Sequence, residues 1–121
     1  MTGKLLSLLL ALGVIGNVTV VRAENIDWTG AAGDGDWMNA ANWSANRLPV
    51  VGDRADIENA TPLTWPILDG ATASCDEVRI AYVAGSIGEL TVTGGATLNV
   101  GGELRLGRKA SDPLPTGHLY I

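Results

Sequence analysis

The segment that decides the fold is Gly94-Gly95-Ala96-Thr97, followed after a short gap by Glu103-Leu104-Arg105-Leu106. The same pattern occurs upstream as Asp69-Gly70-Ala71-Thr72, followed by Glu77-Val78-Arg79-Ile80. The two copies are separated by roughly 25 residues, a period that is typical of solenoid proteins, in which each repeat forms one coil. From residue 69 onward, the chain is therefore expected to fold as a stack of similar coils.

A third unit begins when Gly88-Glu89-Leu90-Thr91-Val92 reappears as Gly117-His118-Leu119-Tyr120-Ile121. Apolar and polar residues alternate throughout these units, which is the period of a β-strand with one buried face. The residues expected to face inward are Val78, Ile80, Tyr82, Leu90, Val92, Leu98, Val100, Leu104, Leu106, Leu119 and Ile121. The residues expected to face water are Glu77, Arg79, Thr91, Thr93, Thr97, Asn99, Glu103 and Arg105.

Glycines mark the ends of the predicted strands, where a sharply turning chain needs a positive φ or the absence of a Cβ atom. Three short strands per coil are the simplest interpretation, stacked in parallel register so that successive coils satisfy each other's backbone groups. The alternative is a sandwich of antiparallel hairpins, which also alternates and also uses Gly-Gly turns. The fixed period favours the all-β parallel solenoid, because a sandwich does not require recurrence at one interval.

The chain stops at Ile121, within a predicted strand and without a capping segment. Repeats bury their apolar faces only against neighbours, and the terminal repeats of a solenoid are atypical caps. We therefore expect a truncated solenoid whose last coil exposes a strand edge that is able to pair with other chains.

Composition limits the classes of partner. The chain has eight basic and thirteen acidic residues, and only Lys4 and Arg22 of these lie before residue 24, which leaves a net charge of −7 on the remainder. An acidic surface repels phosphate groups, so neither nucleic acid nor an anionic lipid surface is an expected partner.

Cys75 is the only cysteine, so no internal disulfide can form and stability must come from packing.

Residues 1–23 have the three parts of a signal peptide. Lys4 lies in a short basic region, an apolar run extends from Leu5 to Ile15 or slightly beyond, and Val21-Arg22-Ala23 places small residues where signal peptidase requires them. Cleavage after Ala23 is predicted, which places the protein outside the cell or on its surface. The alternative is a membrane anchor, but Asn17 interrupts a run that is at the lower limit of a membrane span.

Residues 24–60 do not follow the repeat, and they contain three of the four tryptophans: Trp28, Trp37 and Trp43. Large aromatic side chains in a glycine-rich segment are most simply explained as anchors that close the open end of the first coil. The expected organisation is a signal peptide at 1–23, a Trp-rich N-terminal cap at 24–60 and solenoid repeats at 61–121.

Several motifs resemble bacterial exported proteins. They are Trp28-Thr29-Gly30, Gly33-Asp34-Gly35-Asp36-Trp37, Asn42-Trp43-Ser44 and the Pro-x-x-Gly-Asp-x-Ala-x-Ile pattern at residues 49–57. Together with residues 88–107, they are similar to autotransporter-associated and PEP-CTERM-type β-strand repeats. This resemblance implies a right-handed parallel β-helix displayed outside the cytoplasm, often in proteins that also carry carbohydrate-binding, adhesive or sorting modules. The sequence contains no C-terminal barrel or sorting helix, so the mode of anchoring stays open.

No cluster of residues is predicted to be catalytic or to bind a cofactor or a metal. Asp34 and Asp36, near Asp27, raise the hypothesis of calcium, but two aspartates are too few ligands, and backbone-bonded turn residues are the simpler interpretation. His118 is the only histidine and is expected to be a solvated strand residue. Cys75 is expected to be a small buried residue.

The outward charges are the remaining candidates. In polysaccharide-active β-helices, carboxylates and basic groups project from parallel strands, and the residues in question here are Glu77, Arg79, Glu103 and Arg105. Stacked charges more often form cross-strand ion pairs than an active groove. A further hypothesis is that exposed Trp28, Trp37 or Trp43 stacks on sugar rings.

The expected function is that of a structural, non-enzymatic β-solenoid segment of a secreted or surface-displayed bacterial protein. Adhesion or contact with extracellular matrix or glycan is the leading hypothesis. The alternative is the non-catalytic N-terminal part of a larger carbohydrate-binding or carbohydrate-active exoprotein. Contact with membrane is expected only through the signal peptide or an anchor that this sequence lacks, and the sequence does not define an oligomeric state.

Overall fold

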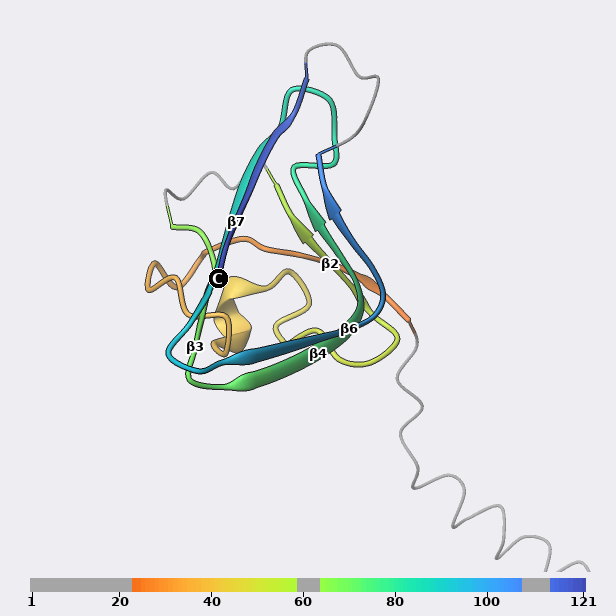
Figure 1. The fold of residues 1–121 in the computed structure, drawn as a ribbon. Coiled ribbons are helices and arrows are strands. Elements are labelled where there is room, and N and C mark those ends of the chain that lie inside the picture. The colour runs from red at the N-terminus through yellow and green to blue at the C-terminus, as the bar shows by residue number, and fades with distance from the viewer. Residues whose placement is uncertain (1–22, 59–63, 108–113) are drawn as a thin grey trace, which may run out of the picture.

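A computed structural model describes residues 23–58, 64–107 and 114–121 (Figure 1). The predicted signal peptide at 1–23 lies outside the described residues except for Ala23, and the predicted boundary between residues 60 and 61 lies outside them as well. The elements in chain order are β1 (Asn25–Asp27), the short 3-10 helix η1 (Ala40–Asn42), β2 (Arg54–Ile57), β3 (Ile67–Asp69), β4 (Thr72–Ile80), β5 (Ile87–Thr93), β6 (Thr97–Leu106) and β7 (Thr116–Tyr120).

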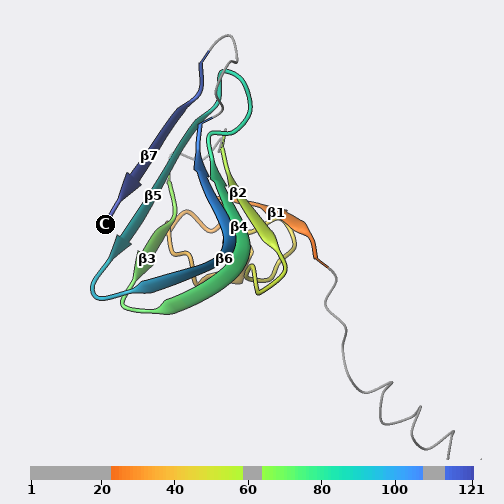
Figure 2. The same cartoon turned by 45° about the vertical axis from the view of Figure 1, so that its right-hand side comes forward.

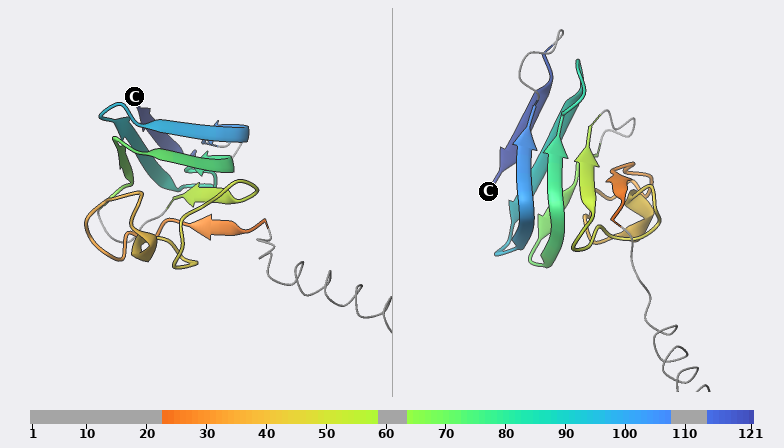
Figure 3. Two further views of the ribbon diagram at one scale, coloured as in Figure 1. Left: turned by 90° about the horizontal axis from the view of Figure 1, so that it is seen from below. Right: turned by 90° about the vertical axis from the view of Figure 1, so that its right-hand side faces the viewer.

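The strands form two sheets, and every pairing between named strands of the described residues is parallel. The first sheet has the order β1-β2-β4-β6 and the second has the order β3-β5-β7. Successive coils lie on one another along a single axis, with the N-terminal cap at one end and β6 and β7 at the other (Figure 3). The predicted all-β fold and parallel solenoid are confirmed, and the antiparallel sandwich is excluded.

The strand register follows the sequence repeat. Thr72 pairs with Thr97, Val78 pairs with Leu104, and Leu90 pairs with Leu119. Between Cys75 and Glu77 the register shifts. One extra residue is accommodated there at the bend of β6, where Gly101 and Gly102 lie against Asp76. The sequence copies therefore occupy equivalent positions in successive coils.

Each coil contains fewer separate strands than the alternation predicted. Two of the three expected short strands are joined in one continuous strand, which bends sharply at a corner of the coil, as β4 and β6 show (Figure 2). The strand stays continuous because the hydrogen bonds of the parallel ladder resume on both sides of the irregularity. The coil therefore has three sides but only two sheets.

The solenoid also begins earlier than the sequence period indicated. β1 pairs with β2 and β2 pairs with β4, so segments from both ends of residues 24–60 are strands of the first sheet. Between them, residues 28–53 form the cap. These two strands lack the Gly-Gly turns and the Glu-hydrophobic-Arg-hydrophobic pattern, which is why the repeat did not reveal them.

The interior of the solenoid is a column of aliphatic side chains. Val78, Ile80 and Leu90 have no exposed surface, and Leu98 and Leu119 of the next coil pack against them. The exposed fractions rise to 41% at Leu104 and 48% at Leu106, because in the described residues no coil lies on the far side of β6. Apart from Tyr82, and from Ile121, which is 98% exposed, the predicted inward positions share one interior, and their burial increases toward the cap.

Tyr82 is an exception, because it does not point into the interior. Ala81 adopts a φ of 54° and is itself fully buried, which interrupts the alternation. The ring of Tyr82 instead lies 4.2 Å from the guanidinium carbon of Arg79, on the outer face. The prediction that Tyr82 faces inward is therefore wrong, because period-two alternation applies only while the chain remains extended.

Gly88 in β5 lies where the backbone of one coil comes very close to backbone atoms of neighbouring segments. A Cβ atom at this position would lie 2.2 Å from the carbonyl oxygen of Ile57 and 2.8 Å from the amide nitrogen of Ala81, both of which are backbone atoms. We expect Gly88→Ala to lower the free energy of unfolding by about 2 kcal/mol, because main chain must move to admit the methyl group. Urea denaturation measures this effect.

Gly101→Ala is the matched control, because its Cβ would meet the side-chain oxygen of the exposed Asp76 at 2.9 Å, and that oxygen can rotate away. A loss of stability at Gly101 as large as that at Gly88 would contradict the close approach of backbone at Gly88.

Candidate functional site

Three tryptophans form the centre of the cap. The ring centroids of Trp28 and Trp43 are 5.0 Å apart, those of Trp37 and Trp43 are 4.8 Å apart, and both contacts are edge-to-face. The indole N–H of Trp43 donates to the carbonyl oxygen of Trp37 at 2.9 Å. The exposed fractions of these side chains are only 1–2%, so the cap closes the first coil as predicted. Stacking of these rings on sugars is excluded in this conformation.

A buried asparagine holds the loop of the cap in place. Asn42 donates from Nδ2 to Oδ1 of Asp34 at 2.6 Å, and its Oδ1 accepts from the amide of Ala32 at 2.9 Å. The backbone carbonyl of Asn42 accepts from Thr29 through both the amide and the hydroxyl. Thr29, Asp34 and Asn42, which belong to three of the motifs in the cap sequence, therefore fix the path of the cap around the tryptophans together.

A second polar cluster joins the cap to the first sheet. Arg47 donates from Nη1 to Oδ2 of the fully buried Asp53 at 2.6 Å and from Nη2 to Oε2 of Glu24 at 2.9 Å. The amides of Val50 and Glu24 donate to the same Asp53 carboxylate. Burial raises the pKa of Asp53, but the hydrogen bonds from Arg47 and the two amides outweigh burial and lower the pKa below its ordinary value.

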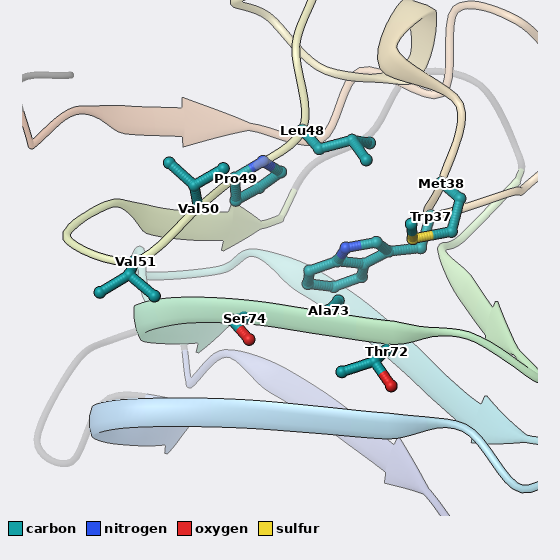
Figure 4. Close-up of a pocket in the computed structure, with 9 residues that line it drawn as sticks. All are labelled: Trp37, Met38, Leu48, Pro49, Val50, Val51, Thr72, Ala73 and Ser74. Atoms are coloured by element: carbon teal, nitrogen blue, oxygen red, sulfur yellow. The ribbon is translucent and has the colours of Figure 1, made fainter. Parts of the chain in front are cut away.

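An apolar groove runs between the cap and β4 (Figure 4). Its volume is about 310 Å³, and its lining residues are Trp37, Met38, Leu48, Pro49, Val50, Val51, Thr72, Ala73 and Ser74. The 48–51 segment forms one wall, and the first half of β4 forms the opposite wall (Figure 4). Val51 is 75% exposed at the rim, so the groove is open to solvent.

The chemistry of this groove suits binding rather than proton transfer. None of these nine lining residues carries an ionisable side chain, and the hydroxyl groups of Thr72 and Ser74 are its polar side-chain atoms besides the Trp37 indole N–H. That N–H is buried and has no hydrogen-bond partner among the described residues. The arrangement can hold an apolar group and offers few polar contacts.

Sequence reasoning did not identify this groove. Residues 49–57 belong to one of the motifs and Thr72 belongs to the repeat, and neither pattern indicates a binding surface. The available signal was the run Leu48-Pro49-Val50-Val51, which is apolar but lies in an otherwise polar segment. The opposite wall could not be predicted, because it comes from a strand that lies more than 20 residues away.

The aspartates considered for calcium are used in hydrogen bonds of the cap. Asp34 accepts from the side chains of Asn39 and Asn42 and from the amide of Asp36, and these bonds lower its pKa. Asp36 accepts from the amide of Met38 at 2.8 Å. Asp27 pairs instead with Asp56 across β1 and β2. No group of three or more potential metal-binding side chains occurs in the described ranges.

The outward charges on β4 and β6 form ion pairs. Arg79 pairs with Glu77 two residues away at 2.7 Å, and Arg105 pairs with Glu103 in the same way. One pair crosses between the coils, from Arg105 to Glu77 at 3.5 Å. The predicted cross-strand pairing is therefore present, but most pairs lie within a strand, because parallel register places Glu77 beside Glu103.

The two remaining candidate residues, His118 and Cys75, differ in exposure. His118 is an exposed residue of β7, as predicted, and its ring centroid lies 6.1 Å from that of Tyr120. Cys75 is 2% exposed in β4, as predicted. The structure brings neither residue into the groove.

The Cys75 thiol is expected to be inert in the native protein. Burial, with smaller contributions from the charges of Asp53 and Asp76, raises its pKa to about 11. At neutral pH the thiolate fraction is then lower by about a hundredfold than for an unperturbed thiol, and the group is also inaccessible. Ellman's reagent should react with the native chain at least about a hundredfold more slowly than with the urea-unfolded chain. Equal rates would contradict the burial of Cys75.

Comparison with known proteins gives no further assignment, since no family model, no curated protein and no solved structure matches the chain. In the part of the chain that the structure describes, no helix has the length and apolar character of a membrane span. The class that the fold defines is a parallel β-solenoid closed at its N-terminal end by a tryptophan-centred cap.

Proposed function

We propose that this chain is a structural, non-catalytic β-solenoid segment of a secreted or surface-displayed bacterial protein that makes adhesive or matrix contacts. The observation that supports this proposal best is the stack of in-register coils on a dedicated cap. Such a stack lengthens by adding coils without redesign of its core, which suits a display role. The outward charges of β4 and β6 pair with one another, which is consistent with a structural role for this face.

The export part of the proposal rests on the signal-peptide pattern of residues 1–23. Expression of the complete reading frame in a Gram-negative host should deliver the protein to the periplasm or the medium with Glu24 as its first residue. Substitution of Ala23 by a bulky residue should block processing, because signal peptidase accepts only small residues there. Unprocessed protein that stays in the cytoplasm would refute export.

The contact part of the proposal is tested by binding. Fluorescently labelled protein should bind to immobilised extracellular matrix proteins, and Val51→Asp, at the rim of the apolar groove, should weaken that binding while leaving stability unchanged. Selective binding to one class of polysaccharide would instead favour the role of a non-catalytic part of a carbohydrate-active exoprotein. Binding to neither surface would refute the adhesive role.

A further inference from the structure

The first half of β4 has no partner strand on the side of the cap. β2 pairs with β4 only from Glu77 onward, whereas β6 pairs with β4 on the other side from Thr72 onward. The segment 72–75 is therefore an edge of the first sheet within the described chain, next to the cap. Three of its residues line the apolar groove, so this edge forms one wall of the groove (Figure 4).

The free backbone groups of this edge belong to Thr72 and Ser74. In a parallel ladder, successive residues of a strand direct their N–H and C=O groups to opposite sides. The carbonyl of Ala71 accepts from the amide of Thr97 in β6, whereas the amide of Asp76 donates in the opposite direction, to the residue before β2. By this alternation, Thr72 and Ser74 direct their N–H and C=O groups away from β6 and into the groove. No described residue bonds to these groups.

The cap leaves this edge open, although it covers two other strand edges. Ser44 bonds to both the amide and the carbonyl of Asp27 at 2.9 Å, which covers the edge of β1. The amide of Ile67 donates to Gly35, and the amide of Trp37 donates to Ile67, which covers the edge of β3. At the first half of β4, the cap instead stands across the groove (Figure 4). A free strand edge of this kind can pair with a further strand.

The groups that line the groove identify the chemistry of its occupant. Two N–H and two C=O groups alternate along the edge at the spacing of a peptide backbone, so the complementary molecule is an extended polypeptide. None of the lining residues carries an ionisable side chain, so a side chain that enters the groove has to be uncharged. The indole N–H of Trp37 is a further donor without a described partner. A volume of about 310 Å³ suits a short segment.

We propose that an extended, uncharged segment of a partner protein binds in this groove as an added strand of the first sheet, parallel to β4. The residue of the partner that lies level with Ala73 donates its N–H to the Thr72 carbonyl and accepts from the Ser74 amide, as in a parallel ladder. Its side chain points inward, as that of Ala73 does, and is apolar because Trp37 and Leu48 lie there. The residues before and after it point to solvent.

This inference deepens the proposed contact role by naming the chemistry of the partner, and it rests on that role because it uses the same groove. It does not depend on export. The test uses a soluble peptide and the purified chain, so its failure is distinguishable from a failure to bind immobilised matrix proteins.

The probe is the peptide acetyl-Thr-Thr-Val-Thr-Thr-amide, titrated into the isotope-labelled full chain and followed by nuclear magnetic resonance. The amide resonances of Thr72 and Ser74 should shift saturably, with a dissociation constant of about 1 mM or lower, and both amides should exchange more slowly with solvent. A peptide with aspartate in place of valine should not bind, because the groove would have to bury a charge without a partner.

Removal of single backbone donors tests the strand pairing itself. An ester in place of the amide of the central valine removes one N–H without added bulk and should weaken binding about fivefold. Ser74→Pro removes the N–H that faces the groove and leaves the bonds to β6, so it should abolish binding. Ser74→Ala is the matched control, because it keeps the amide and should bind as the unmodified chain does. Urea unfolding establishes that each variant is folded.

If Ser74→Pro does not fold, the ester comparison on the unmodified chain decides. Absence of saturable shifts at Thr72 and Ser74 would contradict the proposal. An ester peptide that binds as tightly as the amide peptide, or a folded Ser74→Pro chain that binds normally, would exclude strand addition at β4. Equal binding of the aspartate peptide would contradict the assignment of the apolar groove as the site.

Discussion

Replacement of Trp43 by alanine is expected to lower the free energy of unfolding by about 4 kcal/mol, the largest effect of any single change considered for this protein. Trp43 contacts Trp28 and Trp37 edge-to-face, is 1% exposed and donates its indole N–H to the Trp37 carbonyl. Truncation would leave a large cavity and two rings without their common neighbour. Because the cap covers the edges of β1 and β3, the first coil should lose its order as well.

Chemical denaturation of Trp43→Ala, Trp43→Phe and Trp65→Phe measures this effect. Trp43→Phe keeps an aromatic ring but removes the hydrogen bond, so a loss of about 1.5 kcal/mol is expected. Trp65→Phe is the matched control, because Trp65 is only partly buried at the edge of the same cluster. If Trp43→Ala and Trp65→Phe have the same effect, the cap does not depend on Trp43.

Asp53→Asn is expected to destabilise the protein by about 3 kcal/mol. The Asp53 carboxylate is fully buried and accepts hydrogen bonds from Arg47 and from the amides of Val50 and Glu24. An asparagine has nearly the same shape, but its NH₂ group would face the N–H groups that now donate to the carboxylate. The substitution also removes the negative charge that pairs with Arg47. Glu24→Gln is the matched control, because the Glu24 side chain pairs with the same arginine but is 52% exposed. Its effect should be about 0.5 kcal/mol or less.

The difference in stability between the unmodified chain and Asp53→Asn should depend on pH, which provides an independent check. The pKa of Asp53 is lower in the folded protein than in the unfolded chain, so the carboxylate contributes stability that is fully present above the unfolded pKa of about 4. That stability is lost as the pH falls through the lowered pKa of the folded state. The difference in stability between the unmodified chain and Asp53→Asn should therefore be constant near neutral pH and shrink below about pH 4. A difference that grows in acid would contradict the assigned ion pair.

The stacking of the coils could be predicted from the sequence because its cause is local and repeated. The Glu-hydrophobic-Arg-hydrophobic pattern recurs with its glycines, and pairs such as Val78 with Leu104 follow directly from alignment of the copies. β1 and β2 could not be found in this way, since they share the sheet but not the pattern. Their place depends on tertiary contact with β4, which no period in the sequence records.

Single-residue exceptions to the alternation were also beyond sequence reasoning. Ala81 adopts a positive φ, which is uncommon for a residue with a side chain, and this reverses the direction of Tyr82. The role of the tryptophans as anchors was predictable from their size and setting, whereas their complete burial required the hydrogen-bonded cap around Asn42. The groove beside Trp37 was not predictable, because its two walls meet only in the folded chain.

The most direct test of the stacked coils is a set of inter-strand nuclear Overhauser effects in solution. Stacked coils predict contacts between the backbone protons of Ser74 and Asn99 and between those of Leu90 and Leu119, in the pattern of parallel strands. Short Hα–Hα contacts between Val92 and Leu98, which an antiparallel hairpin with the three-residue loop Gly94-Gly95-Ala96 would produce, would contradict the stacked coils.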